Sequence, residues 1–452
     1  MQNSAVPAPH SEDPTTDAAS TVNVTGAKGV AVSTVHRRAL IGSLTGSTIE
    51  WFDFFLYATA AALIFDKQFF PTDDPTLSLM LSYSSLALTF FVRPLGGIVF
   101  SHIGDRVGRK KTLVLTLSLM GATTVGIGLL PNVDVIGVGA PILLLLFRML
   151  QGLAIGGEWG GAMLLAYEYA PKNRRGLFGS VPQIGITTGL LLASLALAGM
   201  SALPSESFEA WGWRVPFIAS IVLVFLGLWI RGGLDETPAF REQKEKGAIS
   251  KLPLADVLRY HWRAVLVSIG VKLADAAPFY LAATFVVAYA TTQLGFAQIN
   301  VLTAVSVAAA VSCVTIPLAG RLSDAIGRIR TFFGACVLVL VFAIPYYWVL
   351  GTKSLIALFA ASIVLIAFAW APITATLGTL TAEIFPAEIR YTGVSVGYQI
   401  GAALAGGTAP LIATWLLGVY DGSWLPIALF MMASTAIAAV SALLARRVRM
   451  WD

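Results

Sequence analysis

The stretch SHIGDRVGRKKT at residues 101–112 returns as GRLSDAIGRIRT at residues 320–331. A second pattern, E-x-x-P-x-x-x-R, begins at Glu168 and again at Glu383, at a similar spacing along the chain. The two repeats together predict that the chain is built from two copies of one structural unit. The first repeat is identical at four aligned positions, which are Asp105/Asp324, Gly108/Gly327, Arg109/Arg328 and Thr112/Thr331.

The composition predicts that both copies lie in a lipid bilayer. The chain has 452 residues, of which 56% are apolar and only 12% are charged, and its mean hydropathy is +0.77. So little charge cannot cover a water-soluble surface of this size. Because a bilayer core is ~30 Å thick and a helix rises ~1.5 Å per residue, each crossing needs about 20 predominantly apolar residues.

Twelve apolar runs meet this length. They predict an all-α membrane protein with twelve transmembrane helices in two pseudo-symmetric six-helix bundles. The predicted spans are 39–64, 77–103, 112–131, 140–167, 176–200, 213–231, 262–292, 299–319, 331–350, 354–381, 391–418 and 424–445.

The longest polar stretch between spans, at 232–261, predicts a cytosolic loop between the two halves. We therefore expect an N-terminal bundle at 36–231 and a C-terminal bundle at 262–445. Residues 1–35 are polar and are predicted to form a disordered cytosolic tail. Residues 446–452 would form a second, shorter cytosolic tail.

The distribution of Lys and Arg predicts the orientation, because short cytoplasmic loops retain these residues. Of the 30 Lys and Arg, 24 fall on one side of the predicted spans. With an even number of spans, both termini are therefore expected in the cytosol. The protein itself is expected in a bacterial inner membrane. The other six are divided between the opposite side (Lys67, Arg214 and Lys353) and the spans themselves (Arg93, Arg148 and Lys272).

From residue 36 to residue 447 the chain resembles the major facilitator superfamily. GDRVGRKK at 104–111 is similar to the family's loop between spans two and three, and RMLQGLAIGGEWGG at 148–161 is similar to its fourth-span signature. Within the superfamily the resemblance is to metabolite:proton symporters, a branch that includes carriers of shikimate, α-ketoglutarate, citrate, and proline or betaine. The motifs that carry this finer resemblance are EWFDFFLY at 50–57, RPLGG at 93–97, GGEWGGA at 156–162, WGWRVPF at 211–217 and ETPAF at 236–240.

The resemblance also implies a cytosolic latch that steadies the outward-facing state. Positive-inside topology alone would explain the cations of the repeated loop, but not the repeated Asp-x-x-Gly-Arg pattern. The implied latch residues are Asp105, Arg106, Gly108 and Arg109, with Asp324 and Arg328 as the second copy.

Two carboxylates in the first span are candidates for proton coupling. Glu50 and Asp53 lie one turn apart near the predicted midplane and share a helix face with Tyr57, a candidate substrate contact. A desolvated carboxylate there would load and release a proton at physiological pH. The alternative is that both only form salt bridges between helices.

The fourth span places a cation, an amide and a carboxylate on one helical face. Arg148, Gln151 and Glu158 recur at helical spacing, so this face cannot point at lipid. The planar guanidinium of Arg148 suits a substrate carboxylate. A fixed pair with Glu50 or Asp53 is the alternative, and Glu158, near the cytosolic end, is expected to serve gating or packing.

The seventh span adds Lys272 and Asp275, one turn apart and followed by Tyr280. They form either a local ion pair or a pair that substrate breaks, which would free Asp275 to change protonation. Arg93, before the proline and glycines of RPLGG, is interpreted as a gate or anchor. The interior amides of Gln183 and Gln399 are further candidate substrate ligands.

These residues predict a proton-coupled importer of a small carboxylate-bearing metabolite, with a shikimate-like, keto or hydroxy acid favoured. The alternatives are a proton-driven exporter of drugs or metabolites and a transporter-like membrane sensor. No enzyme, metal or cofactor is expected beyond the proton gradient, because the chain shows neither a metal-like His spacing nor a nucleophile–base arrangement. The expected partners are an organic acid or zwitterion, protons and the bilayer, without nucleic acid, and the expected state is a monomer.

Overall fold

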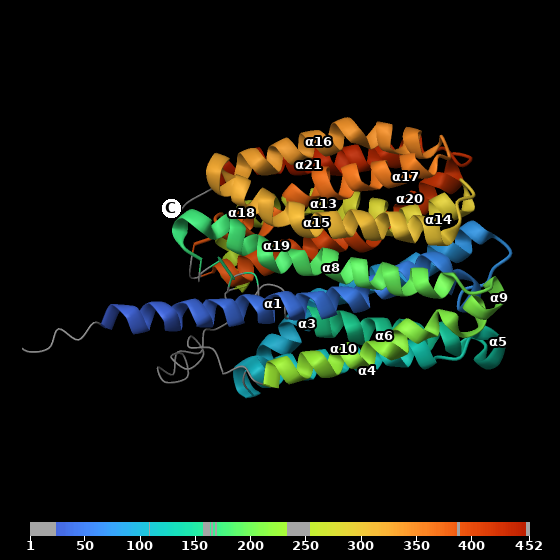
Figure 1. Ribbon diagram of the computed structural model, residues 1–452, viewed down its shortest axis with the longest axis horizontal. Coiled ribbons are helices and arrows are strands. Elements are labelled where there is room, and N and C mark those ends of the chain that lie inside the picture. Colours follow the sequence, from blue (N-terminus) through green and yellow to red (C-terminus); the bar gives the residue numbers. More distant parts are fainter. Residues whose placement is uncertain are drawn as a thin grey trace, which may run out of the picture. The chain divides into compact units, whose positions relative to one another are not determined.

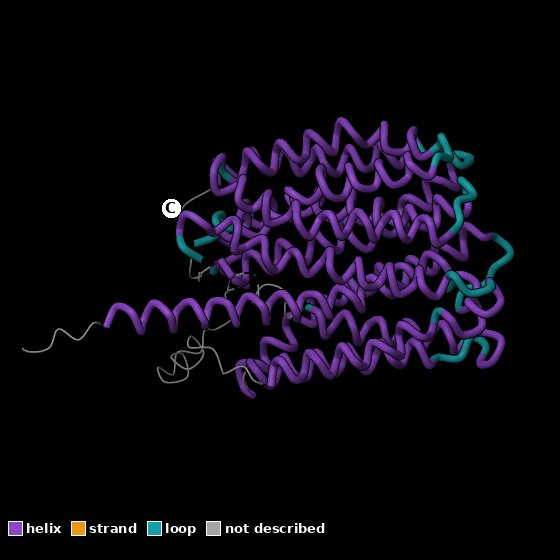
Figure 2. The backbone as a smooth tube through the Cα atoms, viewed as in Figure 1, coloured by secondary structure: helices purple, strands orange, loops and turns teal. Residues whose placement is uncertain are grey.

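The computed structural model describes most of the chain as helix (Figure 2). It forms two compact units, Met1–Ala39 and Leu40–Asp452, and the packing described below lies within the second. The described residues are 24–107, 109–156, 163, 166–167, 170–232, 254–386 and 389–448. Within these ranges, side chains are not described at 24–41, 43, 98, 101–111, 113, 230–232, 254–256 and 391.

The described part of the first half contains six long helices. Short helical turns connect them, which are α2 Phe65–Gln68, α5 Val133–Ile136, η1 Lys172–Arg174, α9 Ser205–Ser207 and η2 Phe208–Gly212. The long helices are α1 Val24–Leu63, α3 Pro75–Val107, α4 Arg109–Leu129, α6 Gly139–Ile155, α8 Arg175–Ser201 and α10 Arg214–Gly232.

The second half begins with α12 Leu254–Tyr260, which lies inside the predicted inter-bundle loop. Three of its six membrane-length segments are continuous, namely α15 Gln298–Ile326, α16 Arg328–Leu350 and α21 Leu425–Val448. The other three contain π-helical turns, which the sequence pattern did not predict. They are α13–η3–α14 (Trp262–Tyr280, Leu281–Phe285, Val286–Thr292), α17–η4–α18 (Leu355–Ser362, Ile363–Trp370, Ala371–Ala382) and α19–η5–α20 (Arg390–Ala402, Ala403–Gly407, Thr408–Val419).

Length and apolar composition let most of these segments cross a bilayer. Among the described residues, eight helical segments meet both criteria alone, and the bent pair Ser205–Gly212 and Arg214–Trp229 makes a ninth. Val114–Leu129 and Gly139–Ile155 are shorter apolar helices, and α1 completes the predicted set. No strand occurs in the described ranges. The all-α fold predicted from the sequence is confirmed.

The outer faces of the helices are apolar, as expected for contact with lipid. On α10, Val222, Phe225 and Trp229 recur at helical spacing and are 65–78% exposed, whereas Phe217 on another face is fully buried. Apolar side chains that remain exposed on a folded protein indicate a non-aqueous partner. This outer face of α10 is therefore suited to contact with lipid.

Within Leu40–Asp452, helices of the same half pack on one another. In the first half α3 packs against α6 and α4 against α10, and in the second half α21 packs against both α13 and α16. The most extensive contact joins the halves, between α8 and α15, which run side by side (Figure 1). Charged side chains enclosed between the halves are therefore shielded from lipid.

The N-terminal tail differs from the prediction. Residues 1–35 were expected to be disordered, but α1 begins at Val24. No proline lies between Pro14 and Leu63 to stop the helix, and extending a formed helix costs far less than starting one. The first helix therefore continues beyond the membrane-length segment.

Candidate functional site

Among the described side chains, six charged ones are buried in the interior of the bundle. Their exposed fractions are all 7% or less. Burying charge in a membrane protein is costly, so such residues mark functional sites unless they only pair with one another. The six are Glu50 and Asp53 of α1, Arg93 of α3, Arg148 of α6, and Lys272 and Asp275 of α13.

Arg148 is held from one side and is open on another. Its Nη1 donates a hydrogen bond to Oε1 of Gln151 at 2.6 Å, and its Cζ lies 3.6 Å from the ring centre of Tyr57. Gln151 Nε2 in turn donates to Oγ1 of Thr124 at 2.8 Å. Nε and Nη2 of Arg148 are buried and have no hydrogen-bond partner among the described residues. These two groups form one edge of the guanidinium, the edge that binds a carboxylate through two parallel hydrogen bonds.

Asp53 lies beside Thr124 but has no charged partner among the described residues. Neither carboxylate oxygen of Asp53 accepts a hydrogen bond of good geometry, although the Thr124 side chain interacts with it. The Thr124 hydroxyl already donates its proton to the carbonyl of Met120 at 2.9 Å and accepts one from Gln151. Because a hydroxyl has one proton and two lone pairs, Thr124 can only accept from Asp53. Thr124 therefore has a lone pair, and no proton, to offer Asp53 when Asp53 carries a proton.

Arg93 lies in the same interior cluster. Its Cζ is 4.2 Å from the ring centre of Phe90, 5.1 Å from that of Phe54 and 6.0 Å from that of Trp51. It is close enough to interact electrostatically with both Arg148 and Lys272. The sequence placed Arg93 near the cytosolic end as a gate or anchor. The structure brings it together with the candidate substrate ligands, and its gating role stays a prediction.

The second half contributes an ion pair. Lys272 Nζ pairs with Oδ2 of Asp275, as one of the two interpretations of the sequence predicted, and lies 3.8 Å from the ring centre of Tyr398. Oδ1 of Asp275 has no hydrogen-bond partner among the described residues. The Trp370 indole donates to the Asp275 backbone carbonyl at 2.7 Å, which fixes this part of α13 against η4.

The two candidate amides, Gln183 and Gln399, differ in how many of their hydrogen-bonding groups are already used. Gln183 Nε2 donates to both the carbonyl and the hydroxyl oxygen of Thr374, at 3.1 and 2.9 Å, and so joins α8 to α18. Gln399 makes one long bond, from Nε2 to the Gly156 carbonyl at 3.4 Å, and its Oε1 has no hydrogen-bond partner in the part of the chain that the structure describes. Gln399 thus has hydrogen-bonding capacity left for a ligand, whereas the Gln183 amide nitrogen is used in holding the halves together.

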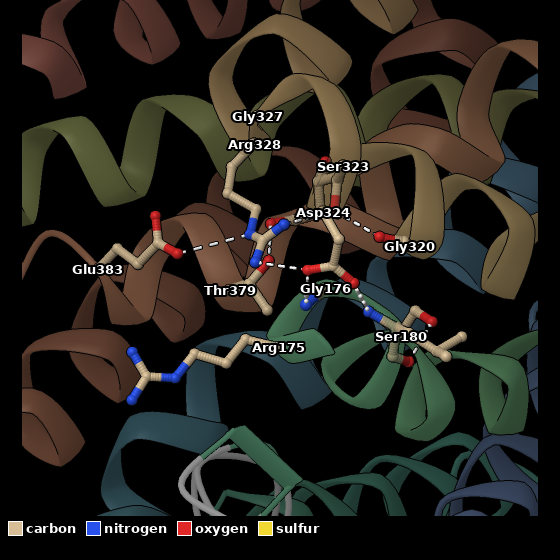
Figure 3. A network of polar contacts seen from close by, with 12 residues as sticks. Arg175, Gly176, Ser180, Gly320, Ser323, Asp324, Gly327, Arg328, Thr379 and Glu383 are labelled. Carbon is tan, nitrogen blue, oxygen red and sulfur yellow. Dashed lines mark hydrogen bonds and ion pairs between the residues drawn. The ribbon is translucent and has the colours of Figure 1, made fainter. Parts of the chain in front are cut away.

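Asp324, which the resemblance assigns to the second copy of the cytosolic latch, contacts both halves of the chain, and its latch role stays a prediction (Figure 3). Its carboxylate accepts hydrogen bonds from the backbone N–H groups of Gly176 at 2.8 Å and Leu177 at 2.9 Å, at the N-terminus of α8. It also pairs with Nη2 of Arg328 at 2.7 Å. A carboxylate at a helix N-terminus satisfies free N–H groups and is favoured by the helix dipole. Asp324 therefore ties α15 of the second half to α8 of the first.

The second repeated motif contacts the same group of residues. Glu383 Oε1 lies 3.5 Å from Nε of Arg328, so the two repeated patterns contact each other at the end of α18 (Figure 3). Gly176 and Gly320 let α8 and α15 approach closely, since a Cβ on either would collide with the opposite helix. Sequence reasoning missed Gly176 and Leu177, because a backbone donor leaves no residue pattern.

Tyr167 lies near the latch between equivalent arginines of the two repeats. Its ring centre is 4.6 Å from Cζ of Arg175 and 5.5 Å from Cζ of Arg390, and its hydroxyl lies 3.2 Å from Nη1 of Arg175. The ring is buried against Ala382 of the second half. The contacts of the first latch copy, Asp105, Arg106, Gly108 and Arg109, and of Glu158, lie outside what the structure describes.

A sequence model of the Major Facilitator Superfamily matches residues 44–398. The chain belongs to this superfamily. Superfamily members at 30–40% identity span most of the chain. The shikimate transporter of Escherichia coli K12 is 38% identical over 411 residues, 90% of this chain and 94% of that protein. The inner membrane metabolite transport protein YhjE of the same organism is 40% identical over 423 residues, 92% of this chain and 95% of that protein.

Another superfamily member, the proline/betaine transporter of Escherichia coli K12, is 33% identical over 392 residues, 84% of this chain and 78% of that protein. The crystal structure of a D-xylose-proton symporter shares the fold, with a TM-score of 0.66 at 17% identity, covering 90% of this chain and 96% of that one. The protein is thus a multi-pass membrane transporter of the superfamily and not an enzyme.

Proposed function

We propose that the protein is a proton-coupled symporter that imports a small carboxylate-bearing metabolite by alternating access. It would lie in a bacterial inner membrane as a monomer with both termini in the cytosol, and would use no cofactor other than the proton gradient. A hydroxylated acid such as shikimate is the favoured substrate class, because the shikimate transporter matches nearly the whole chain.

The unpartnered edge of Arg148 carries the proposal. A buried guanidinium with two unsatisfied donors costs free energy that a bidentate acceptor would recover. Gln151 and Tyr57 fix the plane of the guanidinium before any ligand arrives, which lowers the ordering cost of binding. A substrate carboxylate is the acceptor that fits this geometry.

The surroundings of Asp53 support proton coupling. Its neighbour Thr124 can accept a hydrogen bond from a protonated Asp53 and also holds Gln151, which orients Arg148. Proton loading at Asp53 and substrate binding at Arg148 would therefore share one chain of contacts through α1, α4 and α6. Glu50, one turn away, is the second candidate for the proton site.

The second half would close around the bound acid. In this scheme Lys272 leaves Asp275 for the substrate, and Asp275 becomes free to take up a proton. The contacts of Asp324 with α8 would hold the cytosolic ends together until both ligands are bound. Their release would let the halves rock and open the site inward.

The test is uptake of labelled shikimate, α-ketoglutarate, citrate, betaine and proline into proteoliposomes with an inward proton gradient, with and without protonophore. We expect one acid to accumulate, and protonophore to abolish the accumulation. Asp53→Asn or Glu50→Gln should abolish gradient-driven accumulation but leave exchange of internal for external substrate, because the neutral amide mimics the loaded site.

Asp73→Asn, in the exposed loop before α3, is the matched control and should transport like the wild type. Full accumulation in both the Asp53 and the Glu50 variant would refute proton coupling through the first helix. Accumulation that persists with protonophore would refute symport altogether.

A further inference from the structure

A third repeat places two glutamines at equivalent positions of α8 and α19. SVPQIG at 180–185 returns as SVGYQIG at 395–401, with one extra residue, so Gln183 and Gln399 are the same position in the two copies. The first follows the start of its helix by eight residues and the second by nine. At ~1.5 Å per residue, both amides therefore lie about 12–14 Å from these helix starts, which meet at Tyr167.

The two amides reach across the bundle in opposite directions. Gln183 of the first half donates from Nε2 to the carbonyl and the hydroxyl of Thr374 in the second half, at 3.1 and 2.9 Å. Gln399 of the second half donates from Nε2 to the carbonyl of Gly156, the C-cap residue of α6 in the first half, at 3.4 Å. Gly156 follows Arg148 by eight residues, so these bonds join the halves between the Arg148 site and the helix starts.

The glycine of each Q-I-G sequence holds its helix against the first helix of the same half. A Cβ on Gly185 would lie 2.6 Å from Cβ of Ser47 in α1, and a Cβ on Gly401 would lie 2.6 Å from Cβ of Lys272 in α13. The helices α1 and α13 carry the three buried carboxylates described above. Each copy of the repeat therefore connects a charged helix of its own half with the opposite half.

The two bonds across the bundle are unequal. Gln183 makes two bonds of ordinary length, whereas the one bond printed by the geometry of Gln399 is long, and its buried Oε1 has no hydrogen-bond partner within the described ranges. Tyr398 and Gly401 both contact Lys272, so Gln399 borders the site. A substrate hydroxyl can therefore engage the Gln399 amide at little cost, but would have to displace two good bonds at Gln183.

We infer that Gln183 and Gln399 are reciprocal bridges of a closure between the Arg148 site and Tyr167. Gln183 holds the halves together in the empty carrier and is a positioning residue. Gln399 gives up its bond to Gly156 when a substrate hydroxyl takes its amide, and binding thereby loosens the closure. The role of Gln399 rests on the proposed function, whereas that of Gln183 needs only the contact between the halves.

A thiol in place of Ala382 reports whether this closure is open. Ala382 is fully buried and packs against Tyr167 of the first half, so Ala382→Cys should react with a maleimide when the halves separate there. Labelling rates are measured by mass spectrometry on the purified full-length protein in a Cys313→Ser, Cys336→Ala background, with and without saturating shikimate. Equilibrium binding of labelled shikimate to the same variants gives Kd.

Gln183→Met keeps the length of the side chain and removes both bonds to Thr374. We expect the empty variant to label at least about fivefold faster than the reporter protein with Gln183 in place, with Kd for shikimate changed less than about threefold. Gln293→Met, the same change at an exposed position after α14, is the matched control and should alter neither quantity. A weaker Kd with an unchanged labelling rate in Gln183→Met would make Gln183 a substrate ligand and overturn its role as a bridge.

Gln399→Met should behave differently. Shikimate should raise labelling about two- to threefold when Gln399 is present. The empty Gln399→Met variant should already label at that faster rate, shikimate should add nothing further, and Kd should rise about three- to tenfold. A shikimate response that persists in Gln399→Met would overturn the release of Gly156 by substrate.

Thr374→Val tests the first bridge from its other end, should Gln183→Met not fold. It removes only the hydroxyl acceptor, so labelling should rise about two- to threefold, and an unchanged rate in the folded variant would contradict the bridge. If shikimate does not bind the reporter protein, the favoured substrate class and the role of Gln399 are refuted. Faster labelling of empty Gln183→Met would still support the first bridge, because that measurement uses no ligand.

Discussion

Arg148 illustrates how a single residue can be prepared for a ligand inside a membrane protein. Within the described ranges only its Nη1 group has a hydrogen-bond partner, and that partner, Gln151, is itself held by Thr124. The stabilisation of the guanidinium is therefore incomplete in the structure described. A residue of this kind contributes more to binding than to folding, because its remaining donors are satisfied only when a ligand is present.

Thr124→Val tests the contact chain behind Arg148. The change keeps the shape of the side chain and removes the oxygen that accepts from Gln151, so the guanidinium becomes less well oriented. A hydrogen bond of this kind contributes about 1 kcal/mol, which predicts a roughly three- to tenfold rise in KM for the transported acid. Initial uptake rates over a range of substrate concentrations measure it.

The neighbouring Thr123→Val is the matched control, because the Thr123 hydroxyl bonds only to backbone carbonyls of its own helix. Equal KM values in the two variants would show that Thr124 does not orient the site.

Helical periodicity predicted that Arg148 and Gln151 share a face, and the structure brings them into direct contact. Thr124 was not predicted, because α4 carries four threonines and its sequence does not show which one faces α6. The sequence placed Arg93 near a helix end, because helix packing could not be read from it either. Distance along one helix was known, but the packing of α1 against α3 was not.

At the scale of elements, the contact of α8 with α15 depends on small residues. Gly176 lies against Ser323 and Gly320, and the Asp324 carboxylate reaches the N-terminus of α8 only because these helices approach so closely. In the same interface Cys313 of α15 lies 3.5 Å from the Thr187 hydroxyl of α8. Separation of the two helices would therefore expose this thiol.

Gly176→Val should force α8 and α15 apart at the latch. The added side chain would occupy the space of the Ser323 hydroxyl and the Gly320 carbonyl, so we expect a severalfold faster reaction of Cys313 with a maleimide. The rate is followed by mass spectrometry in a Cys336→Ala background, which leaves Cys313 as the reporter thiol.

Gly199→Val, in the same helix but with open space around the glycine, is the control for the change in helix propensity. The latch assignment would be wrong if both valine variants label at the wild-type rate.

At the scale of the whole molecule, the buried charges balance. The described interior buries three cations, Arg93, Arg148 and Lys272, and three carboxylates, Glu50, Asp53 and Asp275, so it carries no net charge when all six are ionised. Adding one proton and one monoanion preserves this balance. A carrier built in this way can cross between its two states, empty or loaded, without moving charge through the membrane field, which would cost about 2.3 kcal/mol per charge at 100 mV.

Transport of a monocarboxylate should therefore respond to a pH gradient and not to membrane potential. In proteoliposomes, an inward gradient of one pH unit should support up to about tenfold accumulation, because one proton moves with each anion. A potassium diffusion potential at equal pH should change accumulation by less than about twofold. A strong response to that potential would contradict one-to-one coupling.

The sequence predicted the overall architecture well because each crossing leaves a long apolar run. It also predicted the two halves, since Asp324 and Arg328 repeat an earlier pattern. It did not predict the π-helical turns such as Ala403–Gly407, or the bonds between Gln183 and Thr374, because both depend on how helices from different halves pack.

Tyr167 and Ala382 occupy equivalent positions of the two repeats and contact each other. They precede Glu168 and Glu383, so they are the same position in the two copies, and they touch each other. A position that meets its own counterpart lies on the axis relating the copies, as at the axis of a homodimer. Two tyrosine rings would compete there for the same volume, whereas a ring opposite a methyl group fits. The two copies can close on each other here because this position differs between them.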